Sequence, residues 1–149
     1  ADIWDTADAF RFAWQPLSGD GEVVARVRSV QAIRSWSKAG VMIREATDAA
    51  SPHALMLVSA GKGLAFQRRV TRGGLSVSTS GGTGTAPVWV RLTRRGNMFS
   101  AYTSTDGRTW QLVGSELIAM GRDVYAGLAV SSHSATARCT AVFESVAVR

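Results

Sequence analysis

Six side chains of the kinds that hold sugars lie on or beside segments expected to form strands: Trp36, Arg44, His53, Gln67, Arg69 and Trp89. Sugar rings stack on flat aromatic faces, and planar polar groups hydrogen-bond to their hydroxyls. Since alternate residues of a strand share a face, Gln67 and Arg69 lie on the same side of their strand, as do Trp89 and Arg91. The pattern predicts a shallow carbohydrate site on the concave face of a sheet.

Each of these six side chains has an ordinary structural role as its alternative. Arg44 and Arg69 are equally suited to structural ion pairs with Glu45 or Glu22. His53 and His133 are more often hydrogen-bonded structural residues than ligand contacts, and neither lies in a motif with a nucleophilic serine or cysteine. A Ser-His-Asp enzyme is therefore not predicted. The sequence also lacks the HExxH and CxxC spacings of zinc sites.

Alternating apolar and polar residues indicate the strands that must position these side chains. Ala39, Val41 and Ile43 alternate with Gly40, Met42 and Arg44, so the two sets face opposite sides. About ten such strands are separated by turn residues, which is typical of a β-sandwich or jelly roll. They are expected at 10–15, 23–28, 39–44, 53–59, 64–70, 75–79, 88–94, 98–104, 111–113, 124–131 and 140–148.

Helix is expected to be scarce, with room for a turn or two only at 46–51 and 118–122. Asp106 and Gly107 lie between two strand-like runs and predict a structural hairpin that Trp110 covers. Trp14 and Trp110 are expected in the core. Cys139 is the single cysteine, so no intrachain disulfide can form, and it is expected to be a small buried side chain.

Length and charge limit the classes of protein that fit. The chain has 149 residues, of which 46% are hydrophobic, enough for one domain with one core. No apolar run approaches the roughly 20 residues that span a bilayer, so membrane insertion is not expected. The net charge is +6 and comes almost wholly from arginine. The adjacent pairs Arg68–Arg69 and Arg94–Arg95 point to opposite faces of their strands, which disfavours a continuous nucleic-acid patch.

Several motifs, in order along the chain, resemble a known family: DIW, DAF, QPLSGDGEVVARV, AGVMIRE, FQRR, WVRL, STDGRTW and GLAVSSH. Together they resemble a bacterial module with a concanavalin A-like lectin/glucanase (jelly-roll) fold, of the "regulation of enolase" or DUF1349-like group. The resemblance covers residues 2–148. It implies an all-β antiparallel sandwich and a module attached to secreted carbohydrate-active or cell-surface proteins. A glycine-rich strand usually precedes DIW in such modules and is missing here, so a truncated N-terminus is one expectation.

The resemblance also brings calcium and glycoside hydrolysis into consideration. Lectin-like sandwiches often hold calcium through carboxylates and loop carbonyls, and the weak candidates are Asp20, Asp48, Asp123 and Glu144. Glucanases of this superfamily carry an E-x-D-x-x-E strand, which has no match in this sequence. No other cofactor is expected.

The sequence therefore predicts a single module over residues 1–149, excised from or attached to a larger protein, secreted or at the cell surface. Its predicted role is lectin-like: non-catalytic binding of a polysaccharide or glycan as an accessory module. The first alternative is a protein-interaction or assembly module, which needs an exposed apolar patch such as Leu55, Leu57 and Leu64 would form if their partner sheet were absent. The second is a glycoside hydrolase with an atypical carboxylate pair.

Overall fold

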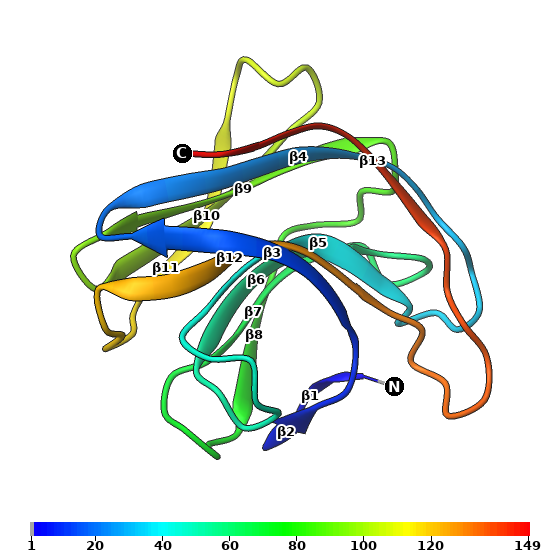
Figure 1. Ribbon diagram of the computed structural model, residues 1–149. Helices are drawn as coiled ribbons and strands as arrows, with labels where there is room; N and C mark the ends of the chain where they lie inside the picture. The colour runs from blue at the N-terminus through cyan, green and yellow to red at the C-terminus, as the bar shows by residue number, and fades with distance from the viewer. Residues whose placement is uncertain (1) are drawn as a thin grey trace.

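The computed structural model describes residues 2–149 as two antiparallel sheets packed face to face (Figure 1). The five-stranded sheet has the order β11 (Gln111–Leu117), β10 (Met98–Ser104), β9 (Val88–Arg95), β4 (Gly21–Val30) and β13 (Ala141–Val148). The six-stranded sheet has the order β3 (Arg11–Ser18), β12 (Asp123–Ser131), β5 (Lys38–Arg44), β6 (His53–Ser59), β7 (Leu64–Arg69) and β8 (Ser76–Ser80). A short hairpin of β1 (Ile3–Trp4) and β2 (Ala7–Asp8) precedes both.

The main core lies between the two sheets and follows from the alternation along each strand. On β9, Val90 and Leu92 are fully buried and point inward, whereas Trp89 and Arg91 are partly exposed on the outer face. The inward side chains of the six-stranded sheet, such as Ile43, pack against them. Each such aliphatic side chain contributes about 1.5–3 kcal/mol by leaving water. This core holds the sandwich together without disulfides.

A second apolar cluster lies on the opposite, outer face of the six-stranded sheet. Its buried members are Ile3, Met42, Leu55, Leu57, Ala65 and Ala129, with Phe10, Phe12 and Trp36 packed around them. In Figure 1, β1 and β2 lie on the side of this sheet that faces away from the five-stranded sheet. Every residue of β5, β6 and β7 is therefore buried, because the core covers one face and the N-terminal hairpin helps to cover the other.

The fold confirms the predicted all-β antiparallel sandwich. It also confirms the alternation on β5, where Val41 belongs to the main core and Met42 to the second cluster. Leu55, Leu57 and Leu64 are buried, so they form no exposed patch for a protein partner. The helical turns expected at 46–51 and 118–122 are wrong, since both segments are irregular.

Three side chains are less buried than predicted. Trp14 is 46% exposed because β3 is an edge strand, and its indole packs edge-on against the ring of Tyr125. Trp110 and Cys139 are half-buried. Trp110 does lie against Trp89, with 6.5 Å between ring centroids, at the hairpin that contains Gly107. Within residues 2–149, no helix is long and apolar enough to cross a membrane.

Candidate functional site

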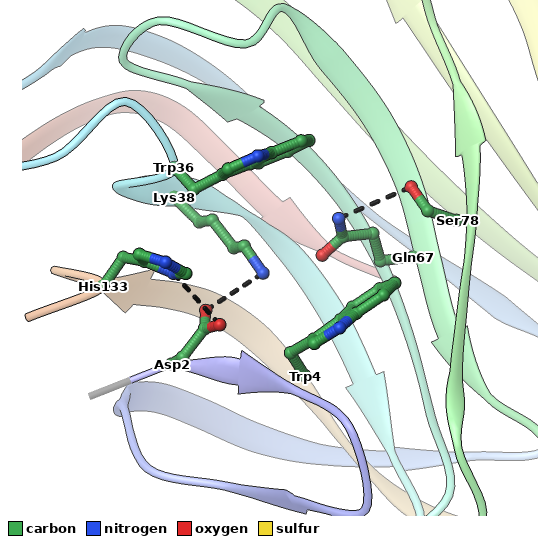
Figure 2. Close-up of a pocket in the computed structure, with 7 residues that line it drawn as sticks. All are labelled: Asp2, Trp4, Trp36, Lys38, Gln67, Ser78 and His133. Atoms are coloured by element: carbon green, nitrogen blue, oxygen red, sulfur yellow. Dashed lines mark hydrogen bonds and ion pairs between the residues drawn. The ribbon is translucent and has the colours of Figure 1, made fainter.

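The clearest pocket opens on the outer face of the six-stranded sheet, beside the N-terminal hairpin. It is a cavity of about 370 Å³, within the usual size range of small-molecule sites. Its lining residues are Asp2, Trp4, Trp36, Lys38, Gln67, Ser78 and His133 (Figure 2). We call these residues the hairpin pocket.

Two tryptophans form opposite walls of the hairpin pocket (Figure 2). Trp4 comes from β1 and Trp36 from the loop that precedes β5. The ammonium of Lys38 lies over both rings, 5.4 Å from the centroid of Trp4 and 5.7 Å from that of Trp36. The two indole faces therefore look toward the same point, and a flat ligand entering between them would contact an aromatic surface on each side.

Lys38 forms the floor of the pocket and is almost fully buried. Its ammonium donates to the carbonyl oxygen of Ile3 at 2.9 Å and to Asp2 Oδ1 at 3.0 Å. A lysine has three N–H donors, so one remains for a ligand. Burial lowers the pKa of Lys38 below its ordinary value, while the negative charge of Asp2 opposes that change.

Gln67 supplies an acceptor beside this donor. It lies on β7, only 3% exposed, and its amide nitrogen makes a long contact of 3.4 Å with Ser78 Oγ. Its carbonyl oxygen Oε1 is buried and has no hydrogen-bond partner in the protein. Buried acceptors are seldom left unpaired, because the missing bond costs about 1–3 kcal/mol. Figure 2 shows the amide of Gln67 between the two tryptophans, so Oε1 is an unpaired acceptor at the base of the pocket.

Asp2 and His133 close the remaining side. Asp2 Oδ2 lies 3.0 Å from His133 Nδ1, and Oδ1 also accepts the backbone N–H of Ile3. The segment that carries His133 is tied to the loop that carries Trp36, because the hydroxyl of Ser37 donates to the carbonyl oxygen of Ser132 at 2.8 Å. The hairpin, the loop before β5 and the segment after β12 thus meet at one point.

A buried ion-pair cluster holds the N-terminal hairpin on the sheet. Asp8 Oδ2 lies 2.7 Å from Nη1 of both Arg44 and Arg69, and Oδ1 lies 2.8 Å from Arg69 Nη2. Arg69 also donates to the carbonyl oxygens of Trp4 and Asp5 on the hairpin. The side chains of all three charged residues are inaccessible to solvent. Burial alone would raise the pKa of Asp8, but the hydrogen bonds from Arg69 and the charges around the carboxylate keep it below its ordinary value.

His53 lies between the two arginines in the sheet register, paired with Arg44 on one side and Arg69 on the other. Arg44 Nη1 lies 3.3 Å from His53 Nδ1, and the carbonyl oxygen of Ser51 lies 3.5 Å from the same nitrogen. Burial lowers the pKa of His53 to about 3, so the imidazole is neutral near pH 7. The cluster therefore consists of two guanidinium groups and one carboxylate, with no additional charge on His53.

The six predicted site residues do not form one site. Trp36 and Gln67 line the hairpin pocket. Arg44, His53 and Arg69 lie beneath the hairpin, where they hold it in place and do not reach the solvent. Their acidic partner is Asp8 rather than Glu45 or Glu22. Glu22 pairs instead with Arg91. Trp89 lies on the outer face of the other sheet, on the far side of the core.

Each of the four weak metal candidates has a partner of its own. Asp48 pairs with Arg72 and Glu144 with Arg26, while Asp20 accepts the backbone N–H of Gly96 and Asp123 the hydroxyl of Ser18. In the part of the chain that the structure describes, no three His, Cys, Asp or Glu side chains gather as metal ligands. The four acids therefore do not fit a shared calcium site.

Sequence reasoning missed Asp2, Trp4, Lys38 and His133. Strand patterns place residues on a face, but they do not show that the segment before β3 folds back over that face. One signal was present in the sequence: Arg44 and Arg69 share the outer face of the sheet and need an acid to balance them. The DAF motif contains that acid, Asp8, next to the DIW motif with Asp2 and Trp4.

Comparison with solved structures finds the same fold at low sequence identity. A functionally unknown protein from Saccharomyces cerevisiae aligns with 100% of this chain and 82% of its own length, at 19% identity and a TM-score of 0.77. The carbohydrate-binding module CBM66 from Bacillus subtilis aligns with 99% of this chain and 83% of its own, at 17% identity and a TM-score of 0.63.

A xylan β-1,4-xylosidase from Bacillus halodurans C-125 aligns with 91% of this chain at 18% identity and a TM-score of 0.65, but with only 28% of its own length. Neither a protein-family model nor a curated protein sequence matches the chain. At these identities the similarity establishes the fold alone. It places the chain among β-sandwich domains that include a carbohydrate-binding module.

Proposed function

We propose that this protein binds carbohydrate without catalysis, and that the hairpin pocket is its binding site. The observation that carries the proposal is the buried, unpartnered Oε1 of Gln67, which lies between two tryptophan walls beside a lysine with a spare donor. A sugar hydroxyl donates and accepts at once, so it can satisfy both groups. Aromatic walls around a few convergent polar groups are the usual form of a small-molecule site.

The charged groups of the pocket favour binding over hydrolysis. Glycoside hydrolases place two carboxyl groups on either side of the scissile bond. Among the described residues that line the hairpin pocket, Asp2 is the one carboxylate. It is already paired with Lys38 and His133, which suits a structural and hydrogen-bonding role.

The pocket is small, so we expect modest affinity. A few stacking and hydrogen-bonding contacts with a net free energy of about 4 kcal/mol correspond to a dissociation constant of ~1 mM. Attachment to a larger protein would raise the effective strength through avidity. We therefore propose a secreted or surface-attached accessory module of bacterial type, related to the "regulation of enolase" group that its motifs resemble.

A glycan array together with affinity electrophoresis in polysaccharide gels tests this proposal. Wild type, Trp4→Ala and Trp36→Ala are compared with Trp89→Ala, a matched control on the opposite sheet. Moderate salt suppresses retention by arginine alone, and a parallel run contains a chelator.

We expect a glycan to retain the wild type and the Trp89 variant, and to release the folded Trp4 and Trp36 variants. Loss of retention in the Trp89 variant alone would move the site to the other sheet. No retention on any glycan would refute carbohydrate binding and favour a protein partner.

A further inference from the structure

We infer that the ring held between Trp4 and Trp36 is a neutral pyranose whose substituents are all equatorial, as in β-glucosides and β-xylosides. The inference rests on the proposed function and names the class of sugar that this site accepts. Its starting point is that the hairpin pocket offers an aromatic face on each of two opposite sides (Figure 2). A site with one aromatic wall would require only one face of the sugar ring to be apolar.

Both faces of an all-equatorial pyranose are apolar, because every axial position carries a hydrogen. Each face can therefore lie against an indole. Galactose has an axial hydroxyl at C4 and mannose has one at C2, and both project from the same face of the ring. Between two tryptophans such a hydroxyl would press on an indole carbon surface, which offers no ordinary hydrogen bond to replace the one lost to water.

The polar groups of the pocket lie where equatorial hydroxyls would reach them. The ends of Lys38 and Gln67 lie between the two indole rings (Figure 2), so they meet the edge of a ring stacked there. The spare N–H of Lys38 and the free Oε1 of Gln67 provide one donor and one acceptor. The two indole walls require two apolar ring faces, and Lys38 and Gln67 require hydroxyls at the ring edge. Both requirements select a pyranose whose substituents are all equatorial.

The charge balance selects against acidic sugars. The Lys38 ammonium lies 3.0 Å from Asp2 Oδ1, so its positive charge is already paired within the pocket. A carboxylate or sulfate on the ligand would have to enter beside Asp2, and the like charges would repel each other. Neutral hydroxyls meet no such penalty.

Titration of matched methyl glycosides, followed by amide chemical shifts, tests the inference in the millimolar range. The probes are the β-D-glucopyranoside, β-D-xylopyranoside, β-D-galactopyranoside and β-D-mannopyranoside, with an arabinofuranoside added as a five-membered ring. We expect the first two to bind about tenfold more tightly than the others, which corresponds to about 1.4 kcal/mol. A ratio below threefold, or preference for the galactoside, mannoside or furanoside, would overturn the inference and leave carbohydrate binding intact. No binding of any probe would overturn both.

Removal of one wall gives a second, independent test. Because the axial hydroxyls of galactose and mannose project from the same face, at least one of Trp4→Ala and Trp36→Leu should lose discrimination against both sugars. In that variant we expect the glucoside to weaken about tenfold while the galactoside changes by less than threefold.

The leucine at position 36 keeps apolar volume against the second cluster, and thermal unfolding confirms that each variant folds. Trp14→Ala, on the exposed edge strand β3, is the control and should keep the wild-type ratio. If both wall variants also keep that ratio, the two-walled recognition is wrong.

Discussion

Asp8→Asn should abolish sugar binding while the sandwich stays folded. The substitution keeps the shape of the side chain but removes the charge that balances Arg44 and Arg69. It leaves two guanidinium groups facing each other in a region that solvent does not reach. The N-terminal hairpin carries Asp2 and Trp4, so any loss of its docking removes one wall of the hairpin pocket and the partner of Lys38.

The size of the effect follows from the burial of the cluster. Removal of one partner from a buried ion pair costs about 3–5 kcal/mol, and Asp8 serves two arginines, which favours the upper half of that range. A loss of about 4 kcal/mol shifts an equilibrium between docked and undocked hairpin nearly a thousandfold. The main core contains no residue of the hairpin, so the loss of global stability is limited to what hairpin docking contributes.

Hydrogen exchange and sugar titration together measure this outcome. We expect amide protection to fall in residues 2–9 and in the strands beneath them, with protection between the sheets retained and sugar affinity lost. Asp48→Asn is the control, because its ion pair with Arg72 is half exposed and should contribute little. Wild-type affinity and protection in Asp8→Asn would refute the claim that this cluster holds the binding site together.

Three further outcomes are expected. The pKa of His53 is lowered from 6.5 to about 3, so between these pH values His53 binds a proton in the unfolded chain but not in the folded one. Stability should fall as pH drops from 6.5 toward 3, by about 2 kcal/mol at pH 5, and urea titrations of His53→Gln should show a flatter profile. Gly107→Ala should cost about 1–3 kcal/mol in urea unfolding, because φ is +76° and a Cβ would lie 2.7 Å from the Trp89 ring; an unchanged midpoint would contradict this. Gln67→Leu removes an unpaired buried acceptor, so the urea midpoint of unfolding should stay the same or rise while sugar affinity falls about tenfold. Lower stability with unchanged sugar affinity would show that Gln67 serves the fold and not the ligand.

The strands were predictable because their pattern is local. Alternation put Val41 and Met42 on opposite faces of their strand, and the structure places Val41 in the main core and Met42 in the second cluster. Burial at the sheet edges was less predictable. Trp14 looks like a core residue by its type, but its exposure depends on β3 having no neighbour on one side, which is a property of the strand order.

The candidate site was only partly predictable. Trp36 and Gln67 were among the predicted sugar ligands, and both line the hairpin pocket. Arg44 and Arg69 have the right chemistry for sugar binding but are used to hold the hairpin. The difference depends on Asp8, which is 36 residues from Arg44 and 61 from Arg69 in sequence. Alternation within a strand contains no information about a contact over that distance.

The second apolar cluster shares no residue with the main core, and this separation gives the molecule a replaceable part. One of the two tryptophan walls comes from the N-terminal hairpin, which rests on the second cluster, whereas the two sheets pack around other residues. Residues 4–7 can therefore vary while Ile3 and Asp8 still anchor the segment to the sheet. The sandwich is thus a scaffold whose pocket can be reshaped through the N-terminal hairpin without any change to the main core.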